Sequence, residues 1–77
     1  MKLEIISPEG LQFEGETESV SLPGEAGLFD ILPHHSMLIG ALQKGVIRYL
    51  THGEWNELPI KSGFVEVKDD HLSVCIE

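Results

Sequence analysis

Apolar and polar residues alternate with a period of two along most of the chain. Segment 2–5 alternates Lys and Glu with Leu and Ile, and segment 72–76 alternates apolar residues with Ser73 and Cys75. Successive side chains of a strand point to opposite faces, whereas a helix repeats its apolar positions every three to four residues. No sustained helical repeat occurs anywhere in the chain. The pattern therefore predicts an all-β domain.

Turn signals divide the alternating segments. Ser7-Pro8-Glu9-Gly10 has the residue order of a type I turn. Lys44-Gly45 is predicted to close a tight hairpin between segments 37–42 and 46–50, and His52-Gly53 to begin a return along segment 55–60. Pro59 lacks a backbone N–H, so it is predicted to lie at a sheet edge or a bulge, in a peripheral strand. A polar turn over 68–71 introduces the last strand.

About nine or ten short strands separated by polar turns predict two antiparallel sheets packed face to face. A chain of 77 residues has room for one small domain, which we place over 1–77. Such a domain buries only about 60% of the surface that its unfolded chain exposes.

The chain carries 13 acidic and 5 basic residues, for a formal net charge of −8. This charge argues against nucleic acid or anionic lipid as a main partner. The single cysteine, Cys75, rules out an internal disulfide, and its strand context predicts a reduced, inert thiol that is packed or half-packed. No signal peptide or apolar segment of membrane-crossing length is present, so we expect a soluble chain.

Few residues are candidates for catalysis or metal binding. His34 and His35 are adjacent, so on an extended backbone they point in opposite directions and do not close on one metal ion. Glu14, Glu16 and Glu18 recur with a period of two, which is typical of a solvated strand face. The sequence thus indicates no catalytic residue, cofactor site or metal site. Phe29, beside the turn residues Gly24 and Gly27, is either a core residue or an exposed anchor.

Five segments carry a resemblance to a known family: the Ser7-Pro8-Glu9-Gly10 turn, the Leu22-Pro23-Gly24 loop, Ile31-Leu32-Pro33 followed by His35, Lys44-Gly45-Val46-Ile47-Arg48, and Ser62-Gly63 before Val65-Glu66-Val67. Their order and spacing over 3–76 resemble the amino-terminal β-sandwich of the epsilon subunit of F-type ATP synthase. No single one of these motifs is decisive.

The resemblance implies a non-catalytic rotor subunit that links the gamma subunit to the membrane c-ring, without a cofactor, at the cytoplasmic face of a bacterial inner membrane. It implies that one face of the sandwich packs against gamma, while the loop over 28–37 and the Lys44-Gly45 turn approach the ring. The family pattern has an acidic residue where this chain has Leu28, and Asp30 is the candidate to replace it. The residues expected to contact partners are Ser7, Leu28, Phe29, Asp30, His34, His35, Ser36, Met37 and Lys44.

Two other functions stay open on the residues alone. A small ligand-binding or carbohydrate-binding module would use Trp55 and Tyr49 as a stacking platform. An enzyme lacks support from any nucleophile, base or metal constellation. Many members of the family continue into a helical hairpin after the sandwich, and because the sequence stops at Glu77 we expect no regulation by such a hairpin.

Overall fold

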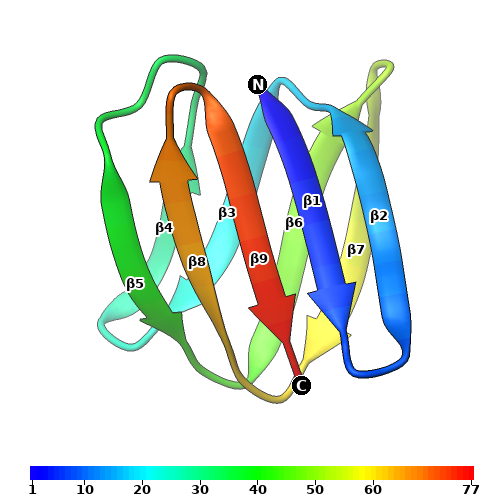
Figure 1. The fold of residues 1–77 in the computed structure, drawn as a ribbon, viewed down its shortest axis with the longest axis vertical. Helices are drawn as coiled ribbons and strands as arrows, with labels where there is room; N and C mark the ends of the chain where they lie inside the picture. The colour runs from blue at the N-terminus through cyan, green and yellow to red at the C-terminus, as the bar shows by residue number, and fades with distance from the viewer.

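The computed structural model describes all 77 residues and consists of strands and turns (Figure 1). It contains no apolar helix of the length that a membrane crossing requires. The nine strands are β1 (Lys2–Ser7), β2 (Gly10–Glu16), β3 (Ser19–Gly24), β4 (Gly27–Ile31), β5 (Leu38–Leu42), β6 (Gly45–Thr51), β7 (Glu54–Ile60), β8 (Gly63–Lys68) and β9 (His71–Ile76).

The strands form two layers, which confirms the predicted sandwich. One layer has the order β2-β1-β9-β8-β5, and the other has the order β4-β3-β6-β7 behind it (Figure 1). The layers are joined at one corner, where Gly24 of β3 pairs with Leu42 of β5. The expectation of antiparallel pairing alone is wrong for one pair, because β1 and β9 run parallel.

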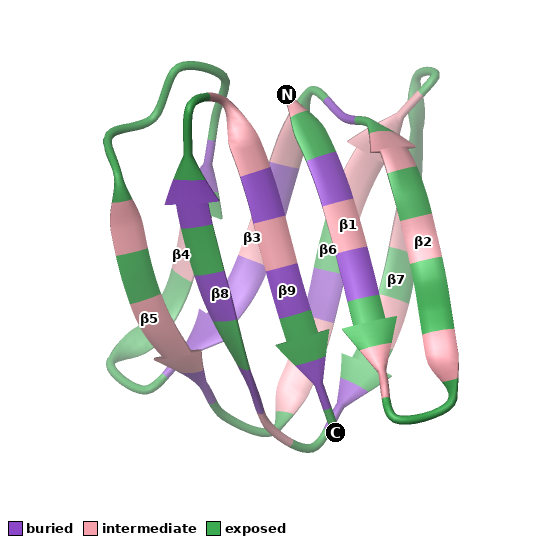
Figure 2. Cartoon of the chain, in the orientation of Figure 1, coloured by how far each residue is buried: buried purple, intermediate pink, exposed green.

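The core lies between the two layers and is built from the inward positions of the alternating strands. Figure 2 shows buried residues alternating with intermediate or exposed ones along β1, β8 and β9. The buried apolar side chains are Leu3, Ile5, Val20, Leu22, Ile31, Leu42, Ile47, Ile60, Val65, Val67, Leu72, Val74 and Ile76. Aliphatic residues thus supply this core, as the two-residue period predicts.

The hairpin predicted at Lys44-Gly45 is wrong. Strand β5 pairs with β8, whereas β6 pairs with β3 and β7, so the turn carries the chain from one layer to the other. The Gln43 N–H donates to the Pro23 carbonyl oxygen at 2.9 Å. A Cβ at Gly45 would lie 2.6 Å from the Pro23 Cβ, so only glycine lets the crossing chain pass so close to β3.

Leu11 and Cys75 both face outward. A bulge between Ile5 and Ile6 makes Leu11 the partner of Ile6, so Leu11 leaves the face of Phe13 and is exposed. Cys75 is exposed as well, because its neighbours Val74 and Ile76 take the inward positions of β9. The predicted packed or half-packed thiol is therefore wrong.

The hairpins β6–β7 and β8–β9 are confirmed. His52 and Gly53 have φ angles of 52° and 75°, and Asp69 and Asp70 have 51° and 61°. Two consecutive residues with positive φ are the mark of the type I′ turn, whose twist matches that of the strands. Pro59 lies in β7, which is the last strand of its layer, as predicted.

Candidate partner-binding surfaces

The residues expected to contact partners lie at two opposite ends of the sandwich. Ser7 ends β1, Leu28 lies near the start of β4 and Lys44 lies in the β5–β6 connection, all at the lower end in Figure 1. The residues from His34 to Met37 belong to the loop at the upper end, because β4 carries the chain from one end to the other between Gly27 and Ile31. The loop over 28–37 is therefore not one surface.

The lower end, which we call the Leu28 end, includes the β1–β2, β3–β4 and β5–β6 connections. Leu28 is 72% exposed beside the β3–β4 turn, and Lys44 is exposed in the neighbouring β5–β6 connection. The Ser7 hydroxyl accepts a hydrogen bond from the Glu9 N–H at 3.2 Å and one from Gln12 Nε2 at 2.8 Å. These bonds fix the β1–β2 turn, so the Leu28 end presents short, braced loops.

An apolar groove of about 300 Å³ opens at the Leu28 end, between β4 and β5. Its walls are formed largely by residues with small side chains or none, and its lining comprises Gly24, Glu25, Ala26, Gly27, Leu28, Phe29, Leu38, Gly40 and Ala41. The two strands are the last ones of their layers and share no hydrogen bonds. The sandwich is thus open here to a side chain from outside.

Phe29 and Asp30 occupy different faces of β4. The Phe29 ring is half-buried and packs against the core, over the backbone of Gly24. Asp30 is exposed on the face that also carries Leu28, two residues earlier. The Phe29 ring thus packs against the core and also lines the groove, whereas Leu28 and Asp30 face outward together.

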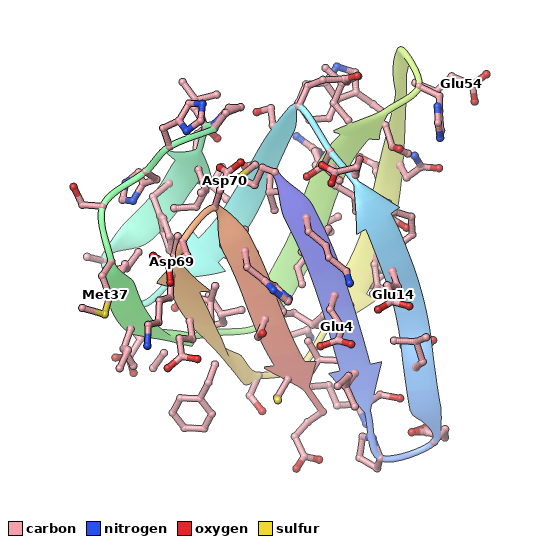
Figure 3. All side chains as sticks on the ribbon, turned by 45° about the horizontal axis from the view of Figure 1, so that its top comes forward. Glu4, Glu14, Met37, Glu54, Asp69 and Asp70 are labelled. Carbon is pink, nitrogen blue, oxygen red and sulfur yellow. The ribbon has the colours of Figure 1, made fainter.

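The opposite end, which we call the Met37 end, is held by one hydrogen bond between distant segments. The His34 N–H donates to Asp70 Oδ1 at 2.8 Å, and His34 has a φ of 67°. His35 Nδ1 lies 2.8 Å from the Ser36 carbonyl oxygen. Figure 3 shows Met37, which is 71% exposed, pointing away from the strands. No group of three or more potential ligands is arranged to hold a metal ion.

We expect acid to release this loop from the β8–β9 turn. The hydrogen bond from His34 lowers the pKa of Asp70 from its ordinary value of 3.8, and the Met1 amino group 3.6 Å away contributes. Because the pKa is lower in the folded state, the stabilisation is complete above 3.8 and is lost as the pH falls through the folded-state pKa. Hydrogen exchange of the His34 amide should accelerate over that range, relative to the intrinsic exchange rate.

The adjacent aspartate supplies the control. Asp69→Asn should keep the acid transition, and Asp70→Asn should abolish it, because asparagine tolerates the same positive φ but does not ionise there. An unchanged transition in Asp70→Asn would assign the pH dependence to another group.

A polar groove lies on the outer face of the five-stranded layer near the β8–β9 turn. It is lined by Glu66, Lys68, Asp69, His71 and Ser73. His71 Nε2 is buried there without a hydrogen-bond partner.

The same outer face carries an apolar row that the sequence analysis did not identify. Directly paired residues of β5, β8, β9, β1 and β2 form it, namely Ala41, Phe64, Cys75, Ile6 and Leu11. The sequence contains a signal for this row, because the outward positions of most of these strands are otherwise polar and an apolar residue there stands out. The bulge that turns Leu11 outward has no such signal.

The stacking platform considered for a carbohydrate does not form. Tyr49 is opposite Asn56 and Trp55 is opposite Leu50, so the two aromatic rings project from opposite faces of the β6–β7 hairpin. Tyr49 instead packs on Phe13 with a centroid distance of 4.5 Å, and burial raises the pKa of its hydroxyl. Trp55 is 56% exposed.

The chain matches one known protein family over its whole length. The family model described as "ATP synthase, Delta/Epsilon chain, beta-sandwich domain" matches residues 1–77. The ATP synthase epsilon chain of Prochlorococcus marinus strain MIT 9303 is 40% identical over 99% of this chain. That of a Nitratiruptor species is 41% identical over the full chain. The matched regions make up 57% and 60% of those two relatives, so the chain spans less than two thirds of their length.

Two solved structures share the fold. A chain in the Tetrahymena thermophila mitochondrial ATP synthase central stalk and c-ring superimposes with a TM-score of 0.85 at 11% identity, over 99% of this chain and 62% of that one. A chain in the Euglena gracilis mitochondrial ATP synthase superimposes with 0.89 at 17% identity, over 96% and 48%. By its sequence over its whole length and by its fold, the chain belongs to the β-sandwich domain family of the ATP synthase delta and epsilon chains.

Proposed function

We propose that the chain is a non-catalytic part of the central stalk of a rotary ATP synthase, where it links the gamma subunit to the membrane c-ring and so couples ion translocation to ATP synthesis. The observation that carries this proposal is the match of the whole chain to epsilon chains at about 40% identity. The location that follows is peripheral, through the complex, at the cytoplasmic face of a bacterial inner membrane.

The Leu28 end is the side that we assign to the c-ring. Three of the nominated residues, Ser7, Leu28 and Lys44, lie at this end, and the apolar groove opens beside Leu28. The family places an acidic residue at the position of Leu28, and here Asp30 supplies a carboxylate on the same face of β4. A ring loop would thus meet an apolar anchor and a carboxylate about 7 Å apart along the strand.

The Met37 end then faces away from the ring. His34, His35, Ser36 and Met37 lie beyond the far end of β4, so they do not contact the ring together with Leu28. We therefore assign these four residues to a contact with the gamma subunit. A rotor subunit must be stiff in order to transmit torque. Side-chain hydrogen bonds hold the loops at both ends of the sandwich, which suits this role.

We expect Leu28→Asp to weaken assembly with the c-ring by about 2 kcal/mol or more, since an anchor in a groove contributes energy of that order. Met37→Asp is the matched substitution at the other end, and it should leave ring binding unchanged. Both side chains are more than 70% exposed, so the isolated domain should stay folded in both variants. Binding to detergent-solubilised c-ring measures the effect, and the reverse ranking would assign the ring to the Met37 end.

Complex formation with purified gamma subunit tests the proposed function as a whole. Size-exclusion chromatography should show this chain eluting with gamma as a stable complex. Addition of the chain to an ATP synthase depleted of its epsilon subunit should restore the coupling of ion flow to ATP synthesis. Absence of any complex with gamma, with both proteins folded, would contradict the proposal.

A further inference from the structure

We draw no further inference here: the strongest candidate, the apolar row of Ala41, Phe64, Cys75, Ile6 and Leu11 on the outer face of the five-stranded layer, carries none because nothing in the structure shows what covers it.

Discussion

Replacing Leu3 by alanine is expected to destabilise the domain by about 2–5 kcal/mol, the cost of removing a buried leucine side chain and leaving a cavity. Leu3 is fully buried in β1, between the layers. A domain of this size has a total stability of about 4–12 kcal/mol. The variant should therefore lose a large part of its stability, which a lower midpoint of urea unfolding followed by circular dichroism would show.

The neighbouring strand offers a matched leucine for this experiment. Leu11 is 57% exposed in β2, because the bulge turns it outward. Leu11→Ala should change the free energy of unfolding by no more than about 0.5 kcal/mol. Similar losses in the two variants would mean that Leu11 is packed and that the bulge is misplaced.

Replacing Gly63 by alanine should cost about 2–3 kcal/mol through overpacking. An added Cβ at Gly63 would overlap the Cys75 carbonyl oxygen and lie 3.3 Å from Ile76 Cα. Both neighbours are backbone atoms of β9, so no side chain is free to rotate away from them. Relief requires β8 and β9 to separate, and the midpoint of urea unfolding should fall accordingly.

Gly40 is the control for this substitution, because it also lies in a strand but has room beside it. A Cβ there would meet Val65 Cγ1 at 3.7 Å, an ordinary van der Waals contact. Gly40→Ala should therefore stay within about 0.5 kcal/mol of the unsubstituted chain. A loss as large as that of Gly63→Ala would point to a general intolerance of strand substitutions, not to overpacking at one site.

The predictions from sequence succeeded where one strand or one hairpin decides the outcome. The alternation over 72–76 placed Val74 in the core, and His52-Gly53 marked a turn between adjacent strands. They failed at Lys44-Gly45, where the turn residues suit a hairpin but the chain crosses between layers. Proximity to Pro23, about twenty residues earlier, decides that crossing, and local preferences carry no information about it.

For the candidate partner-binding surfaces too, the sequence could not show which residues lie together in space. The family resemblance nominated Leu28 and Met37 as parts of one loop that approaches the ring, but strand β4 separates them in space. It also gave no indication that Asp70 accepts the hydrogen bond that holds the His34 loop. The apolar row was missed because its five members come from five strands, and no two neighbours in the row are close in the sequence except Ile6 and Leu11.

The sequence by itself determined the fold class, the positions of the turns and the side of each regular strand that is buried, because these depend on the period of apolar residues and on local backbone preferences. The tertiary structure alone decided which strands pair, that β1 and β9 run parallel, and that the bulge after Ile5 turns Leu11 outward. Pairing depends on contacts between residues far apart in the chain, and one extra residue in a strand inverts every later side chain. The surfaces proposed to bind partners arise from that pairing.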